Sequence, residues 1–160
     1  MCKIIILICL YIFSIGGVLY SKSPSKNVNV DKVVKFLHNS KVFYIATIDG
    51  DKPRVRPFGV SLNIDGKVAI CTGAWKNVFK QIQGNPNVEI SAMTPDGKWI
   101  RLEGNLINTT TKKNRNKFFD FVPSLKELYK DKIEDFQVLS FEKGIATIQN
   151  TDGEIETIEL

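Results

Sequence analysis

The sequence predicts a mainly β domain of the α+β class, in which about six antiparallel strands form a barrel with helices packed outside it. Runs of β-branched and aromatic residues, the clearest at residues 42–48, are typical of strands. Turn sequences separate these runs, including Asp65-Gly66, a pair typical of two-residue hairpins. Consecutive hairpins favour a closed or nearly closed sheet, because closure removes exposed strand edges.

The expected strands follow one another from residue 42 to the last residues of the sequence. Pro57 indicates that the second strand lies at an edge or contains a bulge. We expect strands at residues 42–48, 54–62, 67–72, 88–93 and 99–108, an antiparallel pair at 138–141 and 145–148, and an edge strand at 155–160.

Helical patterns flank the strands. Apolar spacing predicts a helix over residues 30–39, with Asp31 as its cap, and a shorter one that ends at Asn85-Pro86. Two more are expected before the last strands, one opened by the basic run at 112–117 and one beginning at Pro123.

The N-terminal segment is expected to lie outside the domain. Lys3 precedes an apolar run over residues 4–20, which is the pattern of a signal peptide or a membrane anchor. No clear small-x-small cleavage site follows, so cleaved and uncleaved forms are both open. We expect a signal or anchor at 1–20, a polar linker at 21–29 and the domain at 30–160, with the protein anchored or exported and touching membrane only through this segment.

Charge and cysteine usage exclude several classes of function. The formal net charge of +5 comes from scattered lysines, and the basic run at 112–117 fits a solvated helix face, so no nucleic-acid partner is expected. Cys71 is alone in the domain, which excludes a disulfide framework there and fits a small buried side chain. No His or Cys pair has metal-ligand spacing, so no metal site is expected. His38, the chain's only histidine, suits a helix C-terminus.

Four motifs occur in a fixed order between Gly50 and Gly104. They are G-x-x-P-x-x-R, D-G-x-x-x-x-C-T, K-x₈-N-P and W-I-R-L-E-G. This order resembles the pyridoxamine 5'-phosphate oxidase-like family of small FMN-binding barrels. The resemblance implies a six-stranded antiparallel split β-barrel with flanking helices, FMN as the cofactor, and a homodimer that shares its cofactors across a two-fold interface.

Two places in the sequence suit an anionic cofactor. Arg54 and Arg56 stand two apart on a strand, so both side chains point to one face, where two guanidinium groups favour an anion. The alternative is that both are exposed charges on an edge strand, which Pro57 would allow. Thr72, Lys76 and Asn77 lie where a strand gives way to a helix, whose first N–H groups attract anions.

The resemblance assigns roles to these places. It puts Arg56 at a flavin-contacting position, the strand 56–61 along the ring system, and the flavin phosphate at the start of the second helix. Family members with Ser-Arg-Lys there have more basic residues, and Lys80 could compensate for their loss. The expected cofactor-binding residues are Arg54, Arg56, Pro57, Phe58, Gly59, Val60, Ser61, Cys71, Thr72, Lys76, Asn77, Lys80 and Trp99.

Two tryptophans have open interpretations. Trp99 stands where the family's better-known oxidases carry a glutamine that touches the flavin, and its indole could stack on the ring or line the substrate mouth. Packing in a core or a dimer interface is the alternative. Trp75 lies in a loop and is a candidate for the lip of the pocket.

The sequence identifies no catalytic acid–base pair or nucleophile, as expected where a cofactor carries the chemistry. We therefore expect an FMN-dependent oxidoreductase that reduces small organic or nitro-aromatic compounds. The family's C-terminal arginine and histidine pattern for pyridoxal phosphate has no counterpart, which argues against pyridoxamine phosphate oxidase activity itself. A non-catalytic flavin- or haem-binding barrel is the alternative, and a deazaflavin could replace FMN.

Residues 4–20 generate the first prediction. Their continuous hydrophobicity should direct the chain to a membrane, so fractionated cells should hold the full-length protein in the membrane or an exported form shortened at its N-terminus. Recovery of the whole protein from the soluble cytosolic fraction with an intact N-terminus would contradict this.

Overall fold

The computed structural model describes residues 28–160, which form one antiparallel sheet with helices around it. The helices are α1 (Val28–Ser40), α2 (Asn77–Gly84), α3 (Lys112–Phe121), α4 (Pro123–Leu128) and the 3-10 helix η1 (Lys130–Asp135). The strands are β1 (Phe43–Asp49), β2 (Lys52–Phe58), β3 (Ser61–Ile64), β4 (Lys67–Gly73), β5 (Asn87–Met93), β6 (Trp99–Asn108), β7 (Phe136–Gln149) and β8 (Ile155–Glu159).

The connection between β2 and β3 forces the sheet to curl. The strand order is β2-β1-β5-β6-β7-β4-β3, with β8 paired to β7, so β2 and β3 are the two edges of the seven-strand path. In a flat sheet those edges would be roughly 29 Å apart. Only Gly59 and Val60 lie between Phe58 and Ser61, a span of at most about 11 Å. The sheet therefore rolls into a barrel that stays open between β2 and β3.

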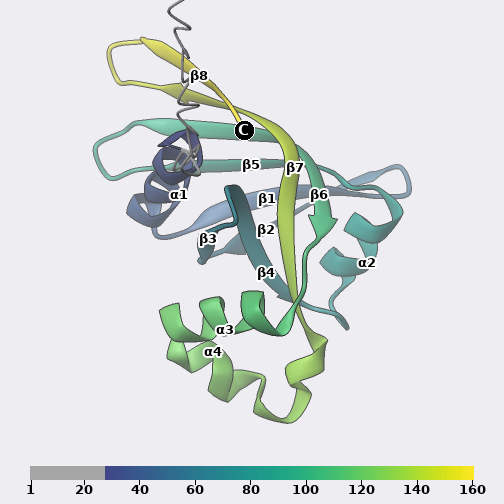
Figure 1. Cartoon of the computed structure of the whole chain (residues 1–160). Helices are drawn as coiled ribbons and strands as arrows, with labels where there is room; N and C mark the ends of the chain where they lie inside the picture. The colour runs from purple at the N-terminus through teal and green to yellow at the C-terminus, as the bar shows by residue number, and fades with distance from the viewer. Residues whose placement is uncertain (1–27) are drawn as a thin grey trace, which may run out of the picture.

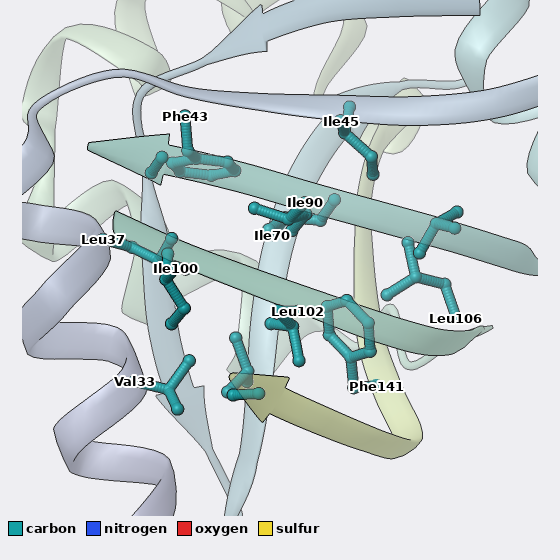
Figure 2. Packing of buried hydrophobic residues seen from close by; sticks show 14 of the residues in the cluster. Val33, Leu37, Phe43, Ile45, Ile70, Ile90, Ile100, Leu102, Leu106 and Phe141 are labelled. Carbon is teal, nitrogen blue, oxygen red and sulfur yellow. The ribbon is translucent and has the colours of Figure 1, made fainter. Parts of the chain in front are cut away.

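The main core fills the inside of this barrel. Helix α1 packs against β3, β4 and β5 with its apolar face, which includes Val33 and Leu37. Figure 2 shows these two side chains together with Ile100 in a group of aliphatic residues that also contains Phe43 and Phe141. The aliphatic and aromatic composition explains the burial, because removing such side chains from water is the main favourable contribution to folding.

A second cluster lies at the other end of the molecule. Figure 1 shows α3 and α4 together below β4 and β7. Phe118, Phe119, Tyr129 and Phe136 form its aromatic centre, with the Phe119 and Phe136 ring centroids 4.7 Å apart. Strand β4 separates the two clusters, because alternate residues of a strand face opposite sides.

The expected second strand is two strands in the structure. Residues 54–62 do not pair continuously, since β2 ends at Phe58 and β3 begins at Ser61. Pro57 does lie on an edge strand, as expected. The hairpin at Asp65-Gly66 is confirmed, with φ values of 51° and 82° that match a turn with two positive φ angles.

The expected antiparallel pair around Glu142-Lys143-Gly144 is wrong. Residues 136–149 form one strand, β7, which pairs along β6, and Glu142 is the extra residue of a bulge. The turn-like residues accommodate that bulge instead of a reversal. Residues 28–160 contain eight strands, as many as the ranges expected one by one, because the division of 54–62 into β2 and β3 offsets the joining of 138–141 and 145–148 in β7. The barrel as a whole was expected to have six.

The N-terminal predictions lie almost wholly outside the described residues. The segment at 1–20 is not described, and of the linker at 21–29 only Val28 and Asn29 are, both inside α1. Asp31 is consequently in the first turn of α1 and not at its cap, and its carboxylate accepts a hydrogen bond from the Asn63 side chain. Within residues 28–160, no helix has the length and hydrophobicity needed to cross a membrane.

Gly104 of β6 pairs with Gly144 of β7, and the close backbone contact at Gly104 generates the second prediction. A Cβ at Gly104 would collide with the backbone of Lys143, which a strand cannot move cheaply. We expect Gly104→Ala to destabilise the protein by about 1–3 kcal/mol, measured by denaturant unfolding.

Gly84→Ala is the matched control, because nothing lies within 4 Å of its added Cβ at the end of α2. It should be neutral or slightly stabilising. Equal losses for both variants would show that the close approach at Gly104 is not what limits the substitution.

Candidate cofactor pocket at the split of the barrel

A pocket of about 390 Å³ opens where the barrel is split, and we call it the split pocket. This volume lies within the range of small-molecule sites. The pocket collects residues from β2, β4, α2 and α4 and from the link between β2 and β3. Its lining residues are Arg56, Pro57, Phe58, Gly59, Val60, Cys71, Thr72, Lys76, Val78, Leu125, Leu128 and Tyr129.

One corner of the split pocket suits an anion. The Thr72 side chain is 2% exposed, and its Oγ1 has no hydrogen-bond partner in the described chain. Lys76, the N-cap of α2, lines the same pocket, and no side chain caps that helix. Asn77 and Val78 follow in the first turn, where backbone N–H groups have no intrahelical acceptor. A hydroxyl without a partner, Lys76 and the start of α2 therefore line the same pocket, and anions bind such helix N-termini.

The two arginines of β2 share a face but have different partners. Arg54 Nε donates to an Asp49 carboxylate oxygen at 3.1 Å, and both side chains are about half exposed. Arg56 Nη1 donates to Thr47 Oγ1 at 2.7 Å, and its Nη2 donates to Gln81 Oε1 at 2.9 Å. Burial lowers the pKa of Arg56, and the positive charge of Arg54 lowers it further. Arg56 therefore lines the pocket as a cation held by neutral oxygens.

Two titratable groups in the pocket remain protonated near neutral pH. Burial raises the pKa of the Cys71 thiol to about 12, against a smaller lowering by Lys76. Burial also raises the pKa of Tyr129 to about 12, with a further contribution from Cys71. Because only a thiolate is an effective nucleophile, Cys71 contributes packing to the pocket and not covalent chemistry. The lining residues include no carboxylate and no histidine.

Some expected site residues lie elsewhere. Asn77 and Lys80 line a separate polar hollow of about 600 Å³ beside α2. Ser61 is fully buried behind the pocket, and Arg54 is turned to Asp49. The structure thus brings together eight of the thirteen expected residues: Arg56, Pro57, Phe58, Gly59, Val60, Cys71, Thr72 and Lys76.

Trp99 is far from the split pocket within one chain. It pairs with Gln149 at one end of β7, whereas Cys71 pairs with Val138 near the other end. Eleven residues of β7 separate the two positions, a path of at most about 36 Å along this curved strand. The guanidinium of Arg101 lies over the Trp99 ring at 5.4 Å. Trp75, in contrast, lies beside the pocket, with its ring centroid 5.3 Å from that of Tyr129.

Sequence reasoning missed several residues of the site. Leu125, Leu128 and Tyr129 form its outer wall, although they were expected only as the apolar side of a helix. Thr47 and Gln81, which hold Arg56, were not identified either. The sequence pattern around Thr47 and Gln81 gave no sign of these roles. Gln81 is 25 positions from Arg56, and Thr47 contacts Arg56 diagonally across the hairpin of β1 and β2.

His38 is engaged away from the split pocket. Its Nε2 lies 2.6 Å from the carbonyl oxygen of Ser61, so this nitrogen carries the proton and donates. The ring stacks on Phe121 with centroids 5.1 Å apart. Within residues 28–160, no group of three or more His, Cys, Asp or Glu side chains could hold a metal ion.

A hollow of about 900 Å³ is a separate feature that we call the outer trough. Residues of β1, β5, β6, β7 and the C-terminus line it, among them the exposed Ile48 and Ile145. Its charged residues are Glu89, Glu103, Lys143 and Glu159. Its one cationic lining residue, Lys143, is exposed, whereas Arg56 in the split pocket is half-buried.

An antiparallel sheet that rolls on itself and remains open at one seam is a split barrel. The chain belongs to the pyridoxamine 5'-phosphate oxidase family, whose profile matches residues 30–149. This match confirms the family resemblance of the motifs between Gly50 and Gly104. Among curated proteins, none matches the chain.

Solved structures agree with this assignment. A NimC/NimA family protein from Clostridium acetobutylicum is 42% identical, with a TM-score of 0.79, over 84% of this chain and 94% of that one. General stress protein 26 from Bacillus anthracis is 19% identical, with a TM-score of 0.63, over 82% of this chain and 98% of that one. A haem-binding protein from Mycobacterium smegmatis is 15% identical, with a TM-score of 0.62, over 84% of this chain and 58% of that one. The last two similarities concern the fold alone.

Proposed function

We propose that the protein binds FMN in the split pocket and acts as an FMN-dependent oxidoreductase of small organic or nitro-aromatic compounds. The observation that carries this proposal is the buried, unpartnered Thr72 hydroxyl beside Lys76 and the start of α2. A buried hydroxyl without a partner costs free energy, and a phosphate oxygen would satisfy it. Membership of the pyridoxamine 5'-phosphate oxidase family supports the same choice.

The rest of the pocket fits the other parts of FMN. The segment 57–60 and the apolar side chains of Val78, Leu125 and Leu128 offer a largely apolar lining for a ring system. Arg56 and Lys76 would hold the anionic end. When bound, FMN supplies the redox chemistry, and the chain's own residues bind it, orient it and exclude water. The protonated Cys71 and Tyr129 fit this division, because neither takes up a proton near neutral pH.

Haem and deazaflavin are the competing ligands. A haem would need an axial ligand, and the chain's only histidine is bonded to Ser61 and stacked on Phe121. The absorption spectrum of the purified protein distinguishes the three, because flavin, haem and deazaflavin absorb differently. A haem or deazaflavin spectrum would replace FMN in the proposal.

The phosphate corner generates the third prediction. A charge-assisted bond is worth about 1.5–3 kcal/mol, and about 1.4 kcal/mol is one decade of affinity. Lys76→Ala and Arg56→Ala should each weaken FMN by roughly tenfold to a hundredfold in a fluorescence titration. Riboflavin, which lacks the phosphate, should lose much less with Lys76→Ala.

Lys80→Ala is the control, because Lys80 lines the separate hollow beside α2. A large loss there with none at Lys76 would move the phosphate one turn along the helix. Equal losses of FMN and riboflavin with Lys76→Ala would make Lys76 structural and the phosphate assignment wrong.

We also propose that the protein is a homodimer, which is the fourth prediction. The outer trough exposes Ile48 and Ile145, and Tyr44 on β1 is 52% exposed, so this face carries apolar groups that a second copy could cover. A closed dimer uses the same face of both copies. Light scattering at micromolar concentration with flavin bound should give twice the monomer mass, and a monomer would contradict the proposal.

A further inference from the structure

The Arg56 guanidinium donates to two neutral oxygen atoms, Thr47 Oγ1 and Gln81 Oε1, and the side chains of Thr47 and Gln81 are also hydrogen-bonded to each other. Thr47 Oγ1 donates to Gln81 Oε1 at 2.7 Å, and Arg56 donates to both oxygens, at 2.7 Å and 2.9 Å. The three residues come from β1, β2 and α2, and Thr47 is 2% exposed. We call this arrangement the Arg56 triad.

Counting protons fixes the direction of every bond in the triad. A guanidinium only donates, so both oxygens accept from Arg56. The single hydroxyl proton of Thr47 goes to Gln81 Oε1, which therefore accepts twice. The amide oxygen of Gln81 must face inward, with its Nε2 turned away. Two adjacent oxygens thus bind the guanidinium fork as the two oxygens of a carboxylate would, but without a negative charge.

The neighbouring Arg54 shows the other arrangement on the same strand face. Its partner is the carboxylate of Asp49, which offsets its charge. No carboxylate bonds to Arg56 in the described part of the chain. An arginine stays protonated in proteins, so Arg56 keeps its positive charge although it is half-buried. Placing such a charge without a counter-ion is costly, and an anionic ligand in the split pocket would compensate.

We propose that Thr47 and Gln81 are positioning residues that fix the Arg56 guanidinium at the wall of the split pocket without neutralising it, which reserves its charge for the phosphate of the ligand. This inference rests on the proposed FMN site. The triad determines which of the two arginines can serve that site, and it explains why the residue on α2 that meets Arg56 is an amide and not a carboxylate.

Gln81→Glu tests the inference with almost no change of shape. The new carboxylate keeps the contact to Arg56 but offsets its charge. We expect FMN affinity to fall by roughly tenfold to a hundredfold, riboflavin affinity to stay within about threefold, and the melting temperature not to fall, because an ion pair replaces a neutral bond. The dependence of FMN affinity on salt concentration should also weaken.

Gln83→Glu is the matched control. It makes the same substitution on the same helix, at an exposed position two residues away, and so reproduces the general effect of one added negative charge. It should change FMN affinity by less than about threefold. A second variant, Thr47→Val, removes the hydroxyl at similar volume and should weaken FMN more than riboflavin.

The outcomes separate the inference from the proposed function. Equal FMN losses for Gln81→Glu and Gln83→Glu, or equal losses of FMN and riboflavin for Gln81→Glu, overturn the positioning role while the FMN site stands. Wild-type protein that binds neither FMN nor riboflavin overturns the proposed function and this inference with it.

Discussion

The two-residue link between β2 and β3 is the constraint on which the rest of the structure depends. Gly59 and Val60 join strands that lie at opposite ends of the hydrogen-bonded path, so the sheet can exist only in a rolled form. The roll encloses the main core, and α1 packs against its strands. The link brings the edges of β2 and β3 near each other, but the two strands do not pair, so the barrel stays open at this seam.

The candidate site follows from this incomplete closure. A fully paired seam would satisfy the backbone of β2 and leave no room between the edges, whereas the open seam exposes the wall formed by residues 57–60. Strand β4 then brings Thr72 to the seam, and α2 begins directly after it with Lys76. Tyr129 covers the pocket from the second cluster, where its ring meets Phe136 edge-on at 4.9 Å. Fold and site are therefore one feature: the place where the barrel does not close.

Much of this could be predicted from the sequence because the signals were local. Alternating apolar residues and the Asp65-Gly66 turn identified the strands, and the strand-to-helix junction after Thr72 identified the anion corner. The break after Phe58 could not be predicted, because Gly59 and Val60 are also compatible with a continuous strand. The bulge at Glu142 was hidden for a similar reason, since turn-type residues also occur in bulges. The different partners of Arg54 and Arg56 could not be predicted either, because Arg56 is bonded to Gln81 of α2, 25 residues away, and no short pattern encodes that contact.

Strand β7 has a consequence for how the chain is synthesised and folds. In the described residues, β2, β1, β5 and β6 form one group of paired strands and β3 with β4 forms another, and β7 is the strand that pairs with both. Because β7 begins at residue 136, the hairpin of β3 and β4 emerges from the ribosome long before its neighbour exists. The edges of β4 and β6 that later pair with β7 stay unpaired until β7 has been made. Pairing across such sequence separations is slow. The barrel can therefore form only after β7 has been made, and residues 136–149 determine when the unpaired edges disappear.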